Sequence, residues 1–296
     1  MRHPMHPRRW PLLVILALML VGCGADRAQD PGDKTNQPVG RIITLAPHLT
    51  ELVYSAGAGN RLIGAVEYSD FPAAALELPR IGDAFRLDYE AIVELDPDLI
   101  LAWESGTPIE VIERLEQLDF RVVALGAGSL NRVADNLRAI GQLTGTQQYA
   151  NAAAEKYERS LHDIRQEAAG LAPVTVFYQV SARPVLTISS RHVIGEAIEL
   201  CGGINVFAGL PELTPSVSPE AVIDAAPEAI IAGRFTANDS SAADGLAAWR
   251  QWKSIPAVRK GNLYLVDANL IARSSVRVLG GVRELCAGLA RAREQL

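Results

Sequence analysis

The chain has 296 residues, of which 49% are hydrophobic and 21% are charged. This composition is typical of a globular protein rather than a disordered one, and the length is sufficient for two ordinary domains. The formal net charge of −6 argues against nucleic acid as the main partner, because proteins that bind nucleic acid carry an excess of basic residues.

Residues 1–22 have the features of an export signal. Three arginines precede an apolar run over residues 12–21, which is too short to span a bilayer and matches a signal peptide. The run ends in Leu20-Val21-Gly22-Cys23, which resembles the lipobox of bacterial lipoproteins, where the cysteine is lipidated; an ordinary signal peptide is the alternative. Cleavage removes three of the 28 basic residues and leaves 25 against 34 acidic residues, a net charge of −9. No later segment is apolar and long enough to cross a membrane, so we expect a soluble protein held by lipid alone.

The next 17 residues, 23–39, are rich in Asp, Gly, Gln and Pro and predict a flexible tether. Strands and helices then alternate over residues 40–144. Strands are predicted at 41–45, 61–66, 98–103 and 120–125, and helices at 49–56, 88–95, 108–118 and 129–143. This alternation indicates an N-terminal α/β lobe with a parallel sheet.

Residues 145–170 contain no proline, and their glycines, Gly145 and Gly170, stand at the two ends. Apolar side chains recur at helical spacing, at Tyr149, Ala153, Tyr157, Leu161 and Ile164. We expect one long helix over 146–170 that connects two lobes. A rigid helical connector permits little hinge opening, so we expect a mostly preformed ligand cleft at the lobe interface.

Residues 171–296 predict a second α/β lobe. Strands are expected at 174–179, 184–188 and 263–266, and helices at 191–201 and 276–294. Short helical pieces are expected at 249–254 and 256–260, and loops at 235–244 and 267–275.

One stretch occurs in both lobes. Residues 90–103 recur at 220–233, with an offset of 130 and no gap, and five positions are identical. Each copy predicts a short helix, a proline that stops it, and a buried strand. Asp88 and Ser218 are the expected N-caps. Two copies at this distance indicate two related lobes rather than a repeat array.

Motifs of the common enzyme classes are absent. The sequence has no Gly-x-Ser-x-Gly, no phosphate-binding Gly-x-x-x-x-Gly-Lys-Ser/Thr and no His-Glu-x-x-His. The histidines are too scattered for a metal pattern, and His48, at a strand end, is expected to be a surface residue of a turn. We therefore expect no metal site and no cofactor, and an exported enzyme is the least favoured interpretation.

Large aromatic side chains stand at the expected carboxyl ends of strands. Tyr68, Phe85 and Trp103 occupy such positions, and Arg273 adds a cation in the second lobe. Parallel sheets bind ligands at these ends, so the rings favour a flat, largely apolar ligand. The alternative is that each ring only covers its own lobe.

Two cysteines remain after Cys23. Export places Cys201 and Cys286 in an oxidising compartment, where a pair tends to form a disulfide; two separate buried thiols are the alternative.

Four segments resemble a known family. They are Arg41-Ile-Ile-Thr-Leu-Ala-Pro47 with Thr50-Glu51-Leu52, Tyr68-Ser-Asp-Phe-Pro72, Asp96-Pro-Asp-Leu-Ile-Leu-Ala-Trp103 and Cys201-Gly-Gly-x-Asn-Val-Phe207. Together they resemble the periplasmic cobalamin-binding proteins of bacterial ABC importers. That family belongs to the helical-backbone class of substrate-binding proteins, which also serves haem, iron-siderophores and some metals.

The resemblance implies a role for several residues. Tyr68 and Trp103 match aromatics that pack on the corrin ligand, and Arg273 matches an arginine of the binding cleft. Glu90 and Glu220 match two surface carboxylates that dock onto arginines of the two permease subunits; compensation of helix dipoles is the alternative role. Cys201 and Cys286 match the family's disulfide. The cleft is expected to include also Phe85, Pro47 and Asn269.

The chain departs from the family at several cleft positions. Ala84, Leu186 and Thr214 stand where the family has aromatics, and Asn269 replaces an aspartate. Phe85 is a candidate replacement for the first of these rings. The resemblance therefore implies a monomeric, lipid-anchored periplasmic protein that delivers a corrinoid, cobalamin or a precursor, to a permease dimer. A haem or ferric-siderophore carrier of the same class is the alternative.

Overall fold

The computed structural model describes residues 39–83, 86–235 and 241–296. The predicted signal peptide, Cys23, the tether up to residue 38, and Ala84 and Phe85 lie outside these ranges. Two parallel four-stranded sheets organise the described part of the chain. We call the part that holds the first sheet the first lobe, and the part that holds the second sheet the second lobe.

The first sheet is built from short strands, and those other than the edge strand β4 are mostly buried. Its order is β2 (Leu62–Ala65), β1 (Ile42–Thr44), β3 (Leu99–Trp103) and β4 (Val122–Leu125). Ile42 pairs with Leu99 and Ile100 with Val122. The covering helices are α1 (Pro47–Ser55), α2 (Tyr89–Leu95), α3 (Ile109–Gln117) and α4 (Arg132–Thr144).

The second sheet repeats this plan. Its order is β8 (Gly203–Asn205), β5 (Val174–Gln179), β9 (Ala229–Arg234) and β10 (Leu263–Asp267). A two-stranded hairpin of β6 (Ser181–Ala182) and β7 (Val185–Leu186) follows β5. The helices are α6 (Val193–Leu200), α7 (Pro219–Ala225), α8 (Ser241–Ala248), α9 (Pro256–Lys260), α10 (Ala268–Ile271) and α11 (Val278–Glu294).

With the hairpin set aside, both sheets have the same topology: second strand, first strand, third strand, fourth strand. The repeated sequence forms the third strand of each sheet, β3 and β9, together with the helix before it. Both predicted N-caps are confirmed, because Asp88 accepts a hydrogen bond from the backbone N–H of Ala91 (3.0 Å) and Ser218 from that of Ala221 (3.2 Å). The sequence repeat is thus a structural repeat.

The prolines end both helices as predicted. Each helix ends on the residue before its proline, Asp96 or Ala226, which adopts a left-handed conformation with φ of 40° or 47°. A residue before proline is disfavoured in the right-handed helical region, so the chain leaves the helix there and enters the strand.

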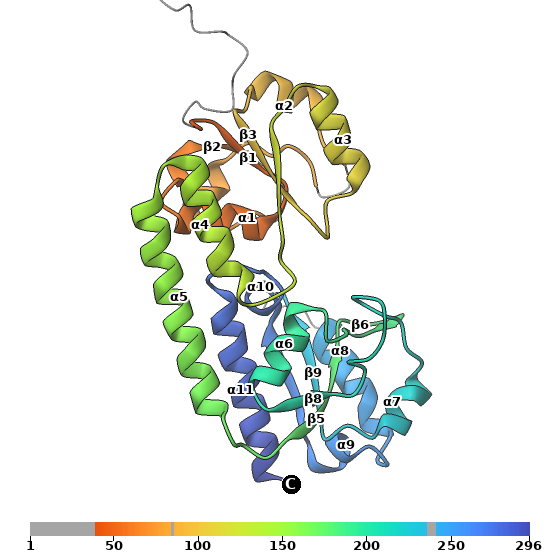
Figure 1. Cartoon of the computed structure of the whole chain (residues 1–296). Helices are drawn as coiled ribbons and strands as arrows, with labels where there is room; N and C mark the ends of the chain where they lie inside the picture. The colour runs from red at the N-terminus through yellow and green to blue at the C-terminus, as the bar shows by residue number, and fades with distance from the viewer. Residues whose placement is uncertain (1–38, 84–85, 236–240) are drawn as a thin grey trace, which may run out of the picture. The chain divides into compact units, whose positions relative to one another are not determined.

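Helix α5 (Gln147–Ala168) is the longest described helix and confirms the predicted long connector. Its buried face is formed by Ala150, Ala154, Tyr157, Leu161 and Ile164. It packs on α1 and α4 of the first lobe and on α6 and α11 of the second (Figure 1). The close approach to α4 is possible because Gly141 faces Ala150, and a side chain at 141 would collide with it. The exact domain limits at residues 144 and 171 stay predictions.

The strands bury alternate residues on opposite faces, as the two-residue period of a strand requires. Leu99 and Leu101 of β3 face a core shared by both lobes, whereas Ile100 and Ala102 face a smaller core of the first lobe. Strand β9 divides its residues in the same way between the shared core and a second-lobe core around Phe177 and Trp249. The shared core is continuous across α5, so hydrophobic packing joins the lobes.

Several elements differ from the predictions, among them α8, α10 and β8. The loop expected at 235–244 is wrong from Ser241 on, where α8 begins, and the loop expected at 267–275 contains α10. Helix α8 is rich in alanine, and it forms where Gly245 packs closely on Gln179 and Ala182. Strand β8 is not among the predicted strands; it forms because β5 offers it an edge to pair with.

Among the described helices, none has both the length and the apolar character needed to cross a bilayer.

Candidate functional site

A pocket of about 370 Å³ lies where the carboxyl ends of β3 and β4 meet the second lobe. We call it the interlobe pocket. Its first-lobe wall includes Trp103, Ala127 and Arg132, and its second-lobe wall includes Arg191, His192 and Ser274. The hydroxyl of Ser274 donates a hydrogen bond to the carbonyl oxygen of Ala127 (2.7 Å), which closes one side of the pocket between the lobes.

Of the predicted ligand-binding aromatics that the structure describes, Trp103 lines this pocket and Tyr68 does not. It is the last residue of β3, and its backbone N–H donates to the hydroxyl of Thr107 (3.0 Å). Gly106 lies against the indole ring, so that any side chain there would collide with it. The indole Nε1 is buried and has no hydrogen-bond partner within the described ranges. The ring is therefore fixed in place with one donor unused.

His48 packs edge-on against Trp103, with the ring centroids 5.2 Å apart and the planes at 85°. The expectation of a surface residue is wrong: His48 is the second residue of α1 and only 5% exposed. Its Nε2 has no partner among the residues described. Burial, and secondarily the charge of Arg273, lowers the pKa of His48 to about 4, so the ring is neutral at neutral pH.

Arg273 lies in the short segment between α10 and α11, and its side chain is 12% exposed. Its guanidinium forms ion pairs with Glu51 (3.1 Å) and Asp70 (2.5 Å) of the first lobe. It also donates to Oδ1 of Asn269 (3.0 Å). Desolvation opposes ionisation of Asp70, but the hydrogen bond and charge of Arg273 outweigh it and hold the pKa of Asp70 below its ordinary value.

Glu51, on α1, is the main site residue to which the sequence assigned no role. It is 2% exposed, and one carboxylate oxygen accepts from both Arg273 and Arg277, each at 3.1 Å. The other oxygen accepts from the hydroxyl of Ser275 at 2.5 Å. In the sequence, the available signal was a glutamate between the apolar residues Leu49, Leu52 and Val53 of this helix, because a buried carboxylate requires partners.

The other predicted ligand residues that the structure describes are not among those that line the interlobe pocket. Tyr68 is 75% exposed, on the loop after β2, and does not line the interlobe pocket. Its backbone has a φ of 64°, which is an outlier for a bulky residue and is found preferentially at functional sites. Pro47 is the first residue of α1, half-buried, and Asn269 lies on α10 beside Arg273. Phe85 lies outside the described residues.

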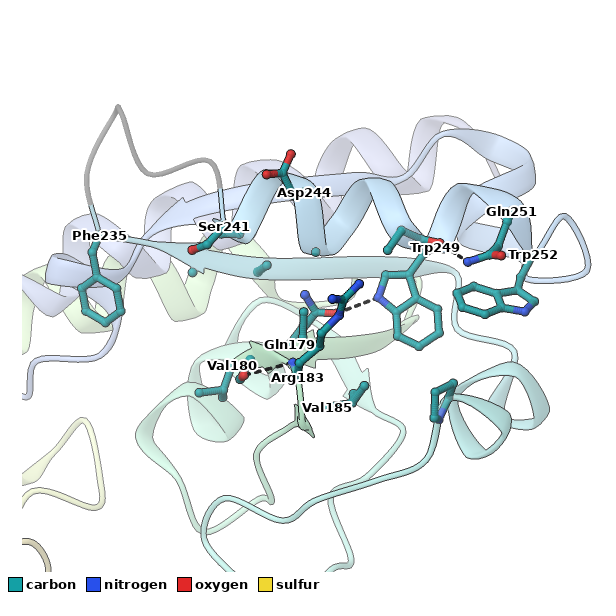
Figure 2. Close-up of a pocket in the computed structure, with 18 residues that line it drawn as sticks. Gln179, Val180, Arg183, Val185, Phe235, Ser241, Asp244, Trp249, Gln251 and Trp252 are labelled. Carbon is teal, nitrogen blue, oxygen red and sulfur yellow. Dashed lines mark hydrogen bonds between the residues drawn. The ribbon is translucent and has the colours of Figure 1, made fainter.

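A larger pocket of about 740 Å³ lies within the second lobe, and we call it the second-lobe pocket (Figure 2). It opens at the carboxyl ends of β5 and β9, between the β6–β7 hairpin and the segment from α8 to Trp252. Trp249 forms part of its wall and donates a hydrogen bond from its indole N–H to Gln179 (2.7 Å). The sequence predicted none of its residues as a ligand site.

The predicted docking carboxylates occupy equivalent places. Glu90 and Glu220 are both exposed and both lie in the first turn of their helices, α2 and α7.

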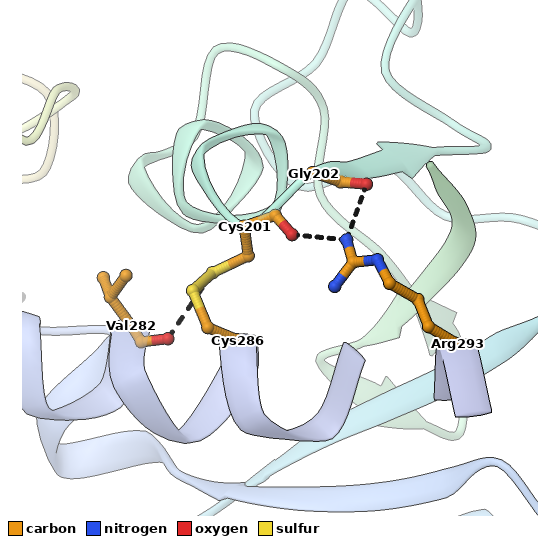
Figure 3. The surroundings of a disulfide bond; sticks show 5 residues. All are labelled: Cys201, Gly202, Val282, Cys286 and Arg293. Carbon is orange, nitrogen blue, oxygen red and sulfur yellow. Dashed lines mark hydrogen bonds between the residues drawn. A yellow bond between two sulfur atoms is a disulfide. The ribbon is translucent and has the colours of Figure 1, made fainter. Parts of the chain in front are cut away.

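The structure contains a disulfide between Cys201 and Cys286, with Cα atoms 4.9 Å apart (Figure 3). It confirms the predicted pair and joins the end of α6 to the middle of α11. Arg293, from the same helix, donates to the carbonyl oxygens of Cys201 (2.7 Å) and Gly202 (3.1 Å). The disulfide and the guanidinium of Arg293 together fix α11 to the segment at the start of β8.

The described residues contain no cluster of three or more His, Cys, Asp or Glu side chains that could hold a metal ion.

Comparisons with known proteins agree with this architecture. A family model described as periplasmic binding protein matches residues 42–270. The vitamin B12-binding protein of Vibrio cholerae is 35% identical over 259 residues, which cover 87% of this chain and 92% of that protein. The crystal structure of the periplasmic vitamin B12 binding protein BtuF of Vibrio cholerae superposes with a TM-score of 0.80 at 34% identity and covers 87% of this chain and 99% of that one.

A periplasmic haem-binding protein of Pseudomonas aeruginosa also matches, with a TM-score of 0.73 and 26% identity over 84% of this chain and 92% of that one. The family match and the identity to the Vibrio protein extend over both lobes and the helix between them. The chain therefore belongs to the periplasmic binding protein family, and it is a periplasmic substrate-binding protein rather than an enzyme.

Proposed function

We propose that this protein captures a corrinoid, cobalamin or a precursor, and delivers it to an ABC importer. The observation that carries the proposal is the similarity to vitamin B12-binding proteins, which spans 92% of the Vibrio cholerae relative at 35% identity. Similarity over both lobes matters because a ligand held between lobes contacts both.

The geometry of the interlobe pocket supports the same conclusion. Trp103 is held rigidly between Gly106 and His48, and it presents an aromatic surface to a pocket lined by both lobes. An aromatic side chain fixed in advance binds a flat ring system with little loss of conformational entropy. A large planar macrocycle with apolar faces is the ligand class that suits it.

Titration of the purified protein with cyanocobalamin, cobinamide, haemin and a ferric siderophore tests the ligand class. We expect the visible spectrum of a corrinoid to shift and calorimetry to show one site per chain. Saturable binding of haemin or the siderophore, with no binding of either corrinoid, would refute the proposal.

A haem carrier is the second candidate, and two observations favour it. The haem-binding protein of Pseudomonas aeruginosa shares the fold at 26% identity, and the resemblance to corrinoid binders implies that Leu186 and Thr214 stand where those proteins have aromatics. The same titration separates the candidates, because bound haem gives an intense Soret band that corrinoids lack.

Glu90 and Glu220 are proposed to orient delivery to the permease. They lie at the same position of two equivalent helices, one in each lobe, and both are exposed. A pair of equivalent carboxylates suits a partner that is itself twofold symmetric. At a helix N-terminus each carboxylate also gains a few tenths of a kcal/mol from the helix dipole, so both roles are compatible.

Reversal of both charges, Glu90→Lys with Glu220→Lys, is expected to abolish uptake by a reconstituted importer and to leave ligand affinity unchanged. The matched control is Glu94→Lys with Asp224→Lys, which reverses two exposed charges on the same two helices at the same offset of 130 residues. Loss of ligand binding in the first variant, or equal loss of uptake in the control, would contradict the docking role.

The lipid anchor and the monomeric state belong to the same proposal. Replacement of Cys23 by Ser is expected to release the exported protein from the membrane fraction into the soluble periplasmic fraction, as checked by fractionation. The anchor is contradicted if the variant stays in the membrane fraction.

A further inference from the structure

We infer that Arg273 joins the two lobes instead of contacting the ligand, and that Glu51, Asp70 and Arg273 are positioning residues that fasten the loop bearing Tyr68. We call these three residues the interlobe latch. The inference rests on the proposed function only where ligand affinity is the readout.

The guanidinium of Arg273 has no terminal donor left for a ligand. Nη1 donates to Glu51 Oε1 (3.1 Å) and to Asp70 Oδ1 (2.5 Å). Nη2 donates to Asp70 Oδ2 (3.3 Å) and to Asn269 Oδ1 (3.0 Å). A guanidinium has four N–H groups on its terminal nitrogens, and these four bonds account for all of them. A ligand would have to displace one of these bonds, and three of the four go to carboxylates, which form some of the stronger hydrogen bonds in proteins.

Glu51 is the buried first-lobe residue of the latch, and it contacts the second lobe through three side chains. Its carboxylate is 2% exposed and is held by Arg273, Arg277 and Ser275, which all belong to the second lobe. With Asp70, the group contains two carboxylates and two guanidinium groups, so the charges balance. A buried carboxylate that loses its partners is strongly destabilised, and separation of the lobes at this point is therefore disfavoured.

The latch acts on the loop that carries Tyr68. Asp70 is two residues from Tyr68, and the next residue, Phe71, has the guanidinium of Arg277 3.9 Å from its ring centroid. On the first-lobe side, Ser69 is fixed by a hydrogen bond from Thr50 (3.1 Å) and one from Arg80 to its carbonyl oxygen (3.0 Å).

The loop is thus held from both lobes. This explains how Tyr68 keeps a φ of 64° while its side chain is 75% exposed, since an unfavourable backbone conformation persists only where its surroundings over-determine it. Tyr68 is presented to solvent, and so to a ligand, on a rigid support.

The variant Asp70→Asn separates a latch from a direct ligand contact. If Arg273 is a latch, Asp70→Asn and Arg273→Gln each weaken cyanocobalamin binding by roughly tenfold, the size of a lost charge-assisted hydrogen bond, and the double variant is no weaker than the worse single one. If Arg273 contacts the ligand, Asp70→Asn frees its guanidinium and affinity is unchanged or higher, which would overturn the inference. Asp70→Glu, which keeps the charge, is expected to recover part of the affinity. The control is Asp163→Asn, which removes an exposed carboxylate on α5.

Two readouts need no ligand. Hydrogen exchange of the amides of residues 67–71 is expected to be at least tenfold faster in Asp70→Asn and in Arg273→Gln than in wild type and Asp163→Asn. Chemical unfolding of the same proteins and of the double variant Asp70→Asn with Arg273→Gln is expected to give non-additive effects for the two substitutions.

Unchanged exchange and additive unfolding would overturn the latch, whatever the protein binds. Failure of wild type to bind a corrinoid would instead contradict the proposed function and leave the exchange result to decide the latch.

Discussion

At the scale of single residues, Trp103 connects the sequence repeat with the candidate ligand site, because it is the last residue of the repeated strand and lines the interlobe pocket. We expect Trp103→Ala to weaken cyanocobalamin binding by ten- to a hundredfold, since a buried aromatic anchor is typically worth about 1.5–3 kcal/mol at an interface. Calorimetric titration measures the change.

The matched control for this substitution is Trp252→Ala, because Trp252 lines the second-lobe pocket instead. We expect near wild-type affinity in that variant. The reverse result, with Trp252→Ala deficient and Trp103→Ala normal, would move the ligand to the second-lobe pocket.

His48 gives a prediction about pH. Burial lowers its pKa from 6.5 in the unfolded chain to about 4 in the folded protein, so the unfolded chain takes up the proton first. The contribution of the neutral ring to stability is complete above the unfolded pKa and is lost as the pH falls toward 4. The loss amounts to roughly 3 kcal/mol.

The variant His48→Leu lacks this titration. We expect the difference in the free energy of unfolding between wild type and His48→Leu to shift by about that amount between pH 7.5 and pH 4, against the wild type, as measured by urea denaturation. The pKa of His192 is also lowered to about 4 by burial, but it is present in both proteins and cancels. Parallel pH profiles would contradict the prediction.

At the scale of elements, the N-cap hydrogen bonds of the two repeated helices are the contacts that can be predicted most directly from the sequence. Asp88→Ala and Ser218→Ala each remove the side-chain acceptor for an N–H group in the first turn. We expect each to lower the free energy of unfolding by about 1 kcal/mol, and Ser218→Thr to lower it less.

Asp224→Ala on α7 is the control for the caps, because it removes an exposed carboxylate that caps nothing in the described structure. We expect a change within about 0.5 kcal/mol for it. Equal losses in the cap variants and in this control would show that the caps contribute nothing of their own.

Elements whose partners are close in sequence were predictable, and elements that depend on distant partners were not. The helix, proline and strand of each repeat follow from capping residues and apolar runs, and the structure has them within one residue. Strand β8 has no such local signals, and those of α8, its alanines, were not sufficient for the prediction of a helix. Strand β8 exists because β5 lies beside it, and α8 because the second sheet gives Leu246 a place to be buried.

At the scale of the whole molecule, the disulfide fixes α11 to α6 across 85 residues of sequence. The double variant Cys201→Ala with Cys286→Ala is expected to lose about 2–4 kcal/mol of stability, since the cross-link restricts the unfolded chain. Thermal denaturation measures the loss. Dithiothreitol should lower the melting temperature of wild type and leave that of the double variant unchanged; equal sensitivity of both proteins would contradict a stabilising role.

Three long-range features of the molecule differ in how far the sequence reveals them: α5 and the interlobe latch, which join the lobes, and the disulfide, which lies within the second lobe. The connector α5 is a continuous helical pattern and was predicted. For the disulfide, the sequence allowed one pair of cysteines, because only Cys201 and Cys286 follow the lipobox cysteine. The interlobe latch was not foreseen, because Arg273 lies 222 positions from Glu51 and 203 from Asp70.

The same contrast applies to the candidate site. Trp103 was predicted as a ligand residue from its position at a strand end. Its contact with His48 and the burial of that histidine were not predicted, because a polar residue in a turn is exposed unless another segment covers it. Arg273 was expected to face the ligand, whereas the structure gives its four terminal N–H groups to Glu51, Asp70 and Asn269.

The sequence by itself determined the two related α/β units, the helix between them, the caps and prolines of the repeat, and the pair of equivalent surface carboxylates. These depend on periodicity, on backbone restrictions and on residues a few positions apart. Only the tertiary structure decided which strand edges pair, which polar side chains are buried, and that Arg273 bonds across the lobes. The physical reason is that burial and charge pairing depend on which distant segments come together, and a linear pattern of residue types does not specify those contacts.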